Sequence, residues 1–245
     1  MVVYDEGKRL MSKKRFIQLV GYLFGFWVLN VSVCHALAFR VTLDTSPLIE
    51  HPAEPFSIEF QLNDGSGTGD ANNRARVSNF NFGSGSVGRM LPTLVGGAAG
   101  DLSAAVTLCD SGFLNEFFQE FIPGNTLSFT VTLTTGVDPG PQPDRFSFAI
   151  LDCATVEIPT LGPGDPLVAV DINSRNPVIE TFAGNPNGVL ACNDGSGIAL
   201  PAPRVAPIPE PTSLALFGIG ILGMLACGWI RQMPGRKTGV RAAWH

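Results

Sequence analysis

Apolar and polar residues alternate with a period of two through most of the chain between residues 39 and 182. Phe56, Ile58, Phe60 and Leu62 form one such run. Because successive side chains of a β-strand point to opposite faces, this period predicts strands that each have one buried face. The predicted strands are 39–43, 56–62, 80–82, 104–108, 127–133, 146–150, 168–172 and 178–182.

Clusters of Gly, Pro, Asn and Asp separate these runs, as expected for turns. Eight or nine short strands divided in this way predict an all-β fold, namely an antiparallel β-sandwich of jelly-roll-like form. The pentapeptide Asn-Asp-Gly-Ser-Gly, at 63–67 and again at 193–197, is typical of a hairpin turn. One segment departs from the alternation and predicts one or two amphipathic helical turns, because its apolar residues fall at helical spacing. These residues are Phe113, Leu114, Phe117, Phe118 and Phe121.

The N-terminal segment, residues 1–38, has the pattern of a secretory signal peptide. Basic residues at 8, 9 and 13–15 precede an apolar run over 16–33, and a small-x-small pattern follows at Ala36-Leu37-Ala38. We therefore expect export by the Sec translocon and cleavage after Ala38, with Ala36 and Ala38 as the recognised residues. Initiation at Met11 would leave a compact basic region, Met-Ser-Lys-Lys-Arg. An uncleaved N-terminal anchor is the alternative interpretation.

The C-terminal segment predicts one transmembrane helix over residues 213–231. Its core, 17 apolar or small residues from Leu214 to Ile230, would reach roughly 26 Å as a helix, against about 30 Å for the apolar core of a bilayer. Stop-transfer charges follow at Arg231, Arg236 and Lys237. They predict a basic cytoplasmic tail over 232–245 and a precursor that crosses the inner membrane once, with the remainder exported.

A short triplet, Pro209-Glu210-Pro211, stands before this span. Proline holds it extended, so it cannot join the helix. The order of triplet, glycine-rich apolar helix and basic tail resembles the PEP-CTERM sorting signal of Gram-negative envelope proteins. The resemblance implies that exosortase, a membrane-embedded cysteine transpeptidase, recognises Pro209, Glu210 and Pro211, cuts nearby, and releases the protein or passes it to another anchor. Ile208 stands where the family usually has Val, residues 232–235 interrupt the basic cluster, and a plain anchor is the alternative.

Parts of the exported region also resemble a recurrent ectodomain of PEP-CTERM proteins that has no assigned activity. They span about residues 39–183 and include Leu43-Asp44-Thr45-Ser46-Pro47-Leu48 and Ser78-Asn79-Phe80-Asn81-Phe82-Gly83. This resemblance implies location and architecture but no chemistry. We expect the ectodomain to occupy residues 39–200. A Pro-rich linker over 201–212 would follow it as a polyproline-like spacer that stands the domain off the membrane.

Acidic residues dominate the exported region. From Phe39 to Thr212 the chain has 19 Asp and Glu against seven Arg and no Lys, a difference of 12 negative charges. Nucleic acid and anionic lipid need Lys and Arg, so both are excluded as partners of this region. Every aromatic residue in the region is Phe. Because Phe lacks the polar edge of Trp and Tyr, a carbohydrate-binding module is disfavoured, although Asp and Asn in loops could still hold sugar hydroxyls.

No catalytic residue stands out in the exported region. His51 is its only histidine, and it lies among prolines without a neighbouring group that would fix it as a base. Carboxylate pairs of the glycosidase kind meet only in space, so the sequence leaves them open. In an oxidising envelope two of Cys109, Cys153 and Cys192 should form a disulfide, and all three pairings stay open.

The sequence predicts no cofactor and no metal site of known spacing. One weaker hypothesis concerns a structural Ca²⁺ ion with oxygen ligands from the segment 64–73, a segment that does not fit the spacing of an EF-hand. Its candidate ligands are Asp64, Asp70, Asn72 and Asn73.

These patterns together predict a non-enzymatic, exported structural or surface protein of the cell envelope or extracellular matrix that exosortase processes. The family's association with biofilm and exopolysaccharide makes that matrix the expected setting. The alternative is a carbohydrate-binding or calcium-dependent adhesion module at the cell surface, and an uncharacterised hydrolase comes third.

Overall fold

The computed structural model describes residues 36–138, 140–192 and 195–209. In this part of the chain there are thirteen β-strands and one short 3-10 turn, η1 (Ser46–Leu48), but no α-helix. In chain order the strands are β1 (Ala36–Asp44), β2 (Phe56–Asn63), β3 (Arg74–Asn81), β4 (Ser86–Val87), β5 (Thr93–Val95), β6 (Ala99–Gly100), β7 (Ala105–Cys109), β8 (Leu114–Ile122), β9 (Thr126–Thr134), β10 (Asp144–Leu151), β11 (Val168–Ile172), β12 (Ile179–Thr181) and β13 (Arg204–Pro207).

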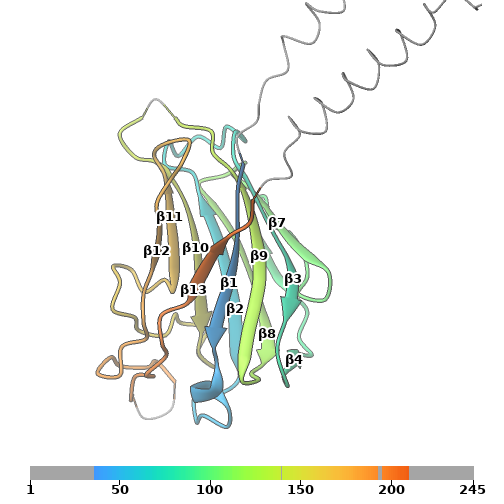
Figure 1. Ribbon diagram of the computed structural model, residues 1–245, viewed down its shortest axis with the longest axis vertical. Helices are drawn as coiled ribbons and strands as arrows, with labels where there is room; N and C mark the ends of the chain where they lie inside the picture. Colours follow the sequence, from blue (N-terminus) through green and yellow to red (C-terminus); the bar gives the residue numbers. More distant parts are fainter. Residues whose placement is uncertain (1–35, 139, 193–194, 210–245) are drawn as a thin grey trace, which may run out of the picture. The chain divides into compact units, whose positions relative to one another are not determined.

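The strands form two antiparallel sheets (Figure 1). Among the described residues, one sheet has six strands in the order β13-β1-β9-β3-β7-β6. The other has seven, in the order β12-β11-β10-β2-β8-β4, and its seventh strand, β5, also pairs with β8. The pairs β1–β9, β2–β8 and β3–β7 are nested in the sequence, each inside the one before. The predicted all-β antiparallel fold is confirmed.

The two sheets share one core, which is rich in phenylalanine. Phe60 of β2 meets Phe129 of β9, in the other sheet, edge to face with ring centroids 5.2 Å apart. Phe129 also lies 4.9 Å from Phe148 of β10, and all three rings are fully buried. Burial of each side chain contributes roughly 1.5–3 kcal/mol, and edge-to-face contacts add to this. The residues of the period-two pattern therefore fill the space between the sheets.

Residues 114–122 form strand β8, so the helical turns predicted for this segment are wrong. The side chains of Asn115, Phe117, Gln119 and Phe121 are buried in strict alternation. Phe117 and Phe121 are four residues apart, a spacing that suits one face of a helix and one face of a strand equally. The alternation is not visible in the sequence because two of the buried residues, Asn115 and Gln119, are polar amides. Their burial is possible because each forms a hydrogen bond inside the fold: Asn115 Nδ2 donates to Leu62 O at 2.9 Å, and Gln119 Oε1 accepts from the N–H of Leu102 at 2.9 Å.

The connection from β2 to β3 also differs from the prediction. The turn at 63–67 does not close a hairpin, because β2 and β3 lie in different sheets. The strand expected around Phe80 and Phe82 is β3, which begins earlier, at Arg74. Polar residues such as Arg74 and Arg76 alternate there with the small, buried Ala75 and Val77 and so weaken the sequence signal.

Residues 204–207 of the predicted linker form a strand rather than a free spacer. Strand β13 lies at the edge of the six-stranded sheet and pairs antiparallel with β1, with Pro207 opposite Phe39 (Figure 1). The N–H of Ile208 continues the pairing and donates to Ala38 O at 2.9 Å. Proline is tolerated on an edge strand because one side of that strand has no partner that needs an N–H donor. The folded domain therefore extends to residue 208.

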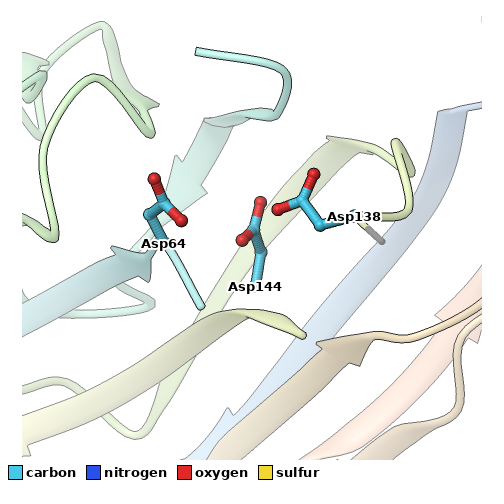
Figure 2. Close-up of side chains that lie close together, drawn as sticks. All are labelled: Asp64, Asp138 and Asp144. Atoms are coloured by element: carbon cyan, nitrogen blue, oxygen red, sulfur yellow. The ribbon is translucent and has the colours of Figure 1, made fainter. Parts of the chain in front are cut away.

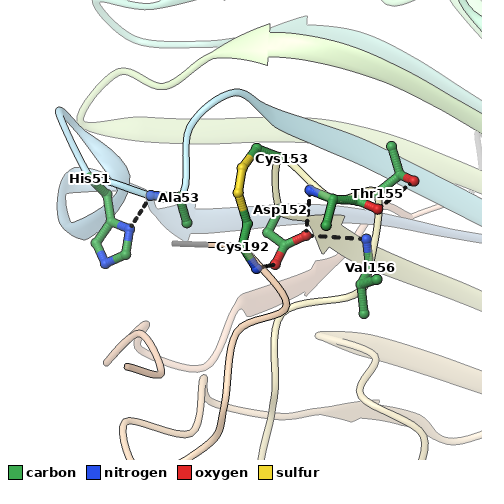
Figure 3. Close-up of a disulfide and its surroundings, with 8 residues drawn as sticks. His51, Ala53, Asp152, Cys153, Thr155, Val156 and Cys192 are labelled. Carbon is green, nitrogen blue, oxygen red and sulfur yellow. Dashed lines mark hydrogen bonds between the residues drawn. A yellow bond between two sulfur atoms is a disulfide. The ribbon is translucent and has the colours of Figure 1, made fainter. Parts of the chain in front are cut away.

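A disulfide joins Cys153 and Cys192, whose Cα atoms are 5.7 Å apart (Figure 3). The buried Asp152 carboxylate fixes both sides of the bridge: Oδ2 accepts from the N–H of Cys192 at 2.9 Å, and Oδ1 accepts from the N–H of Ala154 at 2.9 Å. Among the described cysteines Cys109, the last residue of β7, is free. The structure thus selects one of the three pairings that the sequence left open.

We expect Phe60→Ala to lower the free energy of unfolding by about 3–5 kcal/mol, because it opens a cavity between the sheets. Phe113→Ala is the matched control, since Phe113 is 67% exposed, and it should cost less than about 0.5 kcal/mol. Denaturant unfolding of the two variants, followed by circular dichroism, measures both values. Equal losses in the two variants would contradict the proposed core.

We expect the double change Cys153→Ser and Cys192→Ser to cost about 2–4 kcal/mol of stability, because the bridge closes a long loop of the unfolded chain. Cys109→Ser is the control and should have a much smaller effect. Mass spectrometry of a non-reduced digest checks the pairing directly. A peptide that links Cys109 to either of the other two would overturn it.

Candidate functional site

Both ends of the described chain lie next to one another in the six-stranded sheet. Strand β1 begins at Ala36, which pairs with Thr134 at the end of β9. Strand β13 ends at Pro207, opposite Phe39 of β1. The predicted cleavage residues Ala36 and Ala38 thus lie within β1, and cleavage after Ala38 would leave Phe39–Asp44 as the strand. Cleavage at this position stays a prediction.

The predicted sorting triplet begins where the edge strand stops. Among the described residues, Ile208 makes the last backbone hydrogen bond to β1, and Pro209, the next residue, is exposed. Glu210 and Pro211 lie outside the described residues, as do the predicted span 213–231 and the charges at Arg231, Arg236 and Lys237. Within the part that the structure describes, no helical segment has the length and hydropathy of a membrane span.

A second feature is a cluster of carboxylates at the connections between strands. Asp64 directly follows β2, Asp138 lies between β9 and β10, and Asp144 is the first residue of β10. One carboxylate oxygen of each lies within 4.8 Å of the other two. Figure 2 shows the three side chains approaching the same space from separate segments of the chain. We call these three residues the acidic centre.

Hydrogen bonds hold Asp64 and Asp144 in place. Asp64 Oδ1 accepts from the backbone N–H groups of Ser66 at 2.7 Å and Gly67 at 3.0 Å. Burial opposes the ionisation of Asp64, but the hydrogen bonds that it accepts outweigh burial and lower its pKa. Asp144 Oδ1 accepts from the N–H of Gly65 at 2.9 Å, and its Oδ2 accepts from Asn73 Nδ2 at 2.7 Å. These hydrogen bonds therefore fix the orientation of both carboxyl groups.

Asp110 and Asp138 are less well satisfied. Asp110 is completely buried, and its Oδ2 accepts from the N–H of Asn73 at 2.8 Å. Its Oδ1 is buried and has no hydrogen-bond partner, and the same holds for Asp138 Oδ2. Burial raises the pKa of Asp110 to about 7, and the facing carboxyl of Asp144 adds to the shift. Burial likewise raises the pKa of Asp138, and the charges of Asp144 and Asp70 add to it.

Of the four ligands hypothesised for a Ca²⁺ ion over 64–73, one belongs to the acidic centre and the others lie around it, and the binding of Ca²⁺ itself stays a prediction. Asp64 belongs to the centre. Asn73 bonds to both Gly136 and Asp144 through Nδ2, so it orients the centre, and Asn72 bonds to Asp70 and Asp138. The sequence analysis missed Asp110, Asp138 and Asp144. A usable signal was that Asp64, Asp110 and Asp144 each stand at the very end of an alternating run.

A second group of carboxyls lies on the outer face of the seven-stranded sheet. Glu59 of β2 is only 3% exposed, its Oε1 accepts from Gln61 Nε2 at 3.0 Å, and its Oε2 has no partner. A hydrogen bond to the Glu59 carboxyl raises the pKa of Glu116 on β8 to about 7, and burial adds to this shift. Burial also raises the pKa values of Glu59 and Glu157. Glu59 and Glu116 therefore favour a state with one shared proton near neutral pH.

His51 does not take part in either cluster of carboxyls. It lies in the loop before β2, where its Nδ1 accepts from the N–H of Ala53 at 3.1 Å (Figure 3). This bond stabilises the loop and leaves no sign of a catalytic base held by a third group.

The raised pKa of Glu116 predicts how stability changes with pH. Glu116 has a higher pKa when folded, about 7, than when unfolded, 4.5, so the native state binds more protons between these values. Its contribution is complete below the unfolded pKa and is lost as the pH rises through the folded pKa. We expect the melting temperature to fall by several degrees from pH 5 to pH 8, and Glu116→Gln to flatten this slope.

Glu180→Gln is the control for the Glu116 variant, because it removes an exposed carboxyl from β12 of the same sheet. Thermal melts over the pH series measure both variants. If Glu116→Gln has the same slope as the control, the two glutamates do not share a proton.

The C-terminal part of the chain matches the family model described as the PEP-CTERM protein-sorting motif, over residues 207–231. No curated protein matches the chain, and no solved structure does. The match begins at the last residue of β13 and includes Pro209, Glu210 and Pro211, so the predicted resemblance is confirmed. The chain therefore carries a PEP-CTERM sorting motif, which implies an exported, envelope-associated protein with exosortase as its processing partner.

Proposed function

We propose that this protein is a non-enzymatic structural or surface component of the extracellular matrix, in contact with exopolysaccharide and biofilm. In this proposal a signal peptide over 1–38 delivers the chain to the Sec translocon. A transmembrane helix over 213–231 then holds the precursor, with its C-terminus in the cytoplasm, until exosortase cuts near Pro209, Glu210 and Pro211. The observation that carries the proposal is the sorting motif at residues 207–231.

The position of β13 supports processing close to the folded domain. In the part of the chain that the structure describes, the last hydrogen bond to β1 comes from Ile208, directly after β13, and the proline that opens the triplet is the next residue. A cut at or after the triplet would leave both sheets intact. The product would be the complete domain, with all its strands and its disulfide, and the exosortase would remove only the segment that anchors it.

The core supports a role without catalysis. The buried phenylalanine rings pack against one another between the sheets, with Phe60 and Phe129 in contact. The region has neither Trp nor Tyr to form an aromatic platform for a sugar. The nested pairs β1–β9, β2–β8 and β3–β7 support a jelly-roll-like sandwich, since winding a long hairpin around a barrel produces such nesting. This architecture serves many binding proteins, so it is compatible with a matrix component.

The second candidate is a calcium-dependent adhesion module, and the acidic centre is the observation that favours it. Pull-down with exopolysaccharide, with and without Ca²⁺, separates the two candidates. Binding that needs Ca²⁺ favours the adhesion module, and binding that is independent of Ca²⁺ favours the matrix component.

We expect the protein purified from a host with exosortase to have an intact mass that ends near Pro209–Pro211. The same host without exosortase should yield a protein that ends at His245. Glu210→Ala should accumulate the longer form, because it removes the charge that lies between the two prolines of the triplet. Glu180→Ala, an exposed change on β12, should be processed like the unchanged protein. A mass that ends at His245 in both hosts would show that the segment is only an anchor.

A further inference from the structure

Four buried or half-buried carboxyls meet where three connections between strands come together. Asp64 and Asn73 bound the connection from β2 to β3, Asp110 follows β7, and Asp138 and Asp144 belong to the connection from β9 to β10. Asn73 ties these connections to one another, because its N–H donates to Asp110 and its side-chain amide donates to Asp144. The geometry is therefore set by several separate segments and not by one loop.

These carboxyls lack the positive charge that their number requires. The ion pair in the part of the chain that the structure describes is Arg145–Asp171, at 3.4 Å, and it includes none of them. Asp110 is completely buried, and its Oδ1, like Oδ2 of Asp138, has no hydrogen-bond partner. Asn73 bonds to the carboxyls of both Asp110 and Asp144, which places the Asp110 carboxyl beside the acidic centre. A buried carboxylate oxygen without a donor is costly, and carboxylates that face each other repel. Either protons or a cation must therefore occupy the space between them.

The spacing suits a cation. The oxygens of Asp64, Asp138 and Asp144 lie within 4.8 Å of one another. A point therefore exists that is no more than about 2.8 Å from each of them, close to the Ca–O distance of about 2.3–2.6 Å. All the donors are oxygens, as hard divalent cations require. Ligands from flexible connections favour Ca²⁺, which accepts irregular coordination, over Mg²⁺, which demands a near-ideal octahedron.

We propose that Asp64, Asp138 and Asp144 bind one Ca²⁺ ion and that the buried Asp110 carboxylate adds its charge to the same site. The ion joins the connections that follow β2, β7 and β9. The site lies at the end of the sheets where β9 finishes at Thr134, opposite the start of β1. Ca²⁺ therefore stabilises the end of the domain at which β1 begins. This inference does not depend on the proposed matrix function.

The test uses the full-length protein in detergent, stripped with EDTA and then dialysed. Isothermal titration with CaCl₂ should give one binding site, and 1 mM Ca²⁺ should raise the melting temperature by several degrees, because the ion binds the folded state. Asp138→Asn should weaken binding at least tenfold. Asp144→Asn should abolish Ca²⁺ binding, but this change also disturbs the hydrogen bond that Asp144 accepts from Asn73. Asp138 is less buried and makes no such bond to Asn73, so Asp138→Asn tests the loss of a ligand more directly.

The variant Asp110→Asn distinguishes a role in Ca²⁺ binding from a role in folding alone, because the two roles predict different changes of the melting temperature. Without Ca²⁺ it should raise the melting temperature, since it removes a buried, unpaired charge and keeps an oxygen for the N–H of Asn73. In 1 mM Ca²⁺ it should lose most of the stabilisation that the unchanged protein gains. A variant that is less stable in both conditions would show that Asp110 serves folding alone.

Asp101→Asn is the matched control. Asp101 also accepts hydrogen bonds from the N–H groups of a turn, those of Ser103 and Ala104, but it stands outside the acidic centre. It should bind Ca²⁺ as the unchanged protein does, which excludes a general effect of charge. No heat of binding and no shift of the melting temperature up to 10 mM CaCl₂ would overturn the proposal and leave protons as the neutralising charge. An equal shift with MgCl₂ would overturn the assignment to calcium.

Discussion

The contact between phenylalanine rings across the two sheets holds a strongly acidic domain together. The exported region carries 12 more negative than positive charges, and the described ion pair, Arg145–Asp171, is partly exposed on both sides. Exposed ion pairs contribute about 0–1 kcal/mol, so attraction between charges does not offset the repulsion. Burial of rings such as Phe60, Phe129 and Phe148 is the favourable contribution large enough to offset the repulsion between the negative charges. The same burial also offsets the cost of the carboxyls that are buried at the strand ends.

Alternation predicted the part of the fold in which a strand has one apolar face. It located β1, β2, β9, β10 and β11, because each of these strands alternates large apolar residues with polar ones. Alternation did not predict β8, because two of its buried residues, Asn115 and Gln119, are polar amides. It also did not predict β13, because prolines are present on this edge strand and around it. The short strands β4, β5 and β6 have two or three residues each, too few for any period.

The two parts of the candidate site differ in how far the sequence could reveal them. The sorting motif is a continuous segment whose residues act in order, so its recognition needs no fold. The acidic centre is discontinuous: Asp64 was predicted, whereas Asp110, Asp138 and Asp144 lie 46, 74 and 80 residues further along the chain. Only the pairing of strands brings them together, through β2 with β10 and β3 with both β7 and β9. Sites built by long-range pairing are invisible to local patterns for this reason.

The disulfide and the edge strand together limit how far the domain can open under tension. A pull on the C-terminal side acts first on β13, whose pairing to β1 covers four residue pairs. Once β13 is released, the chain can lengthen from Cys192 to Pro209 by at most roughly 60 Å. There the covalent link to Cys153 carries the force into the end of β10, in the middle of the other sheet. Under tension the domain can thus yield by a limited length without losing its core.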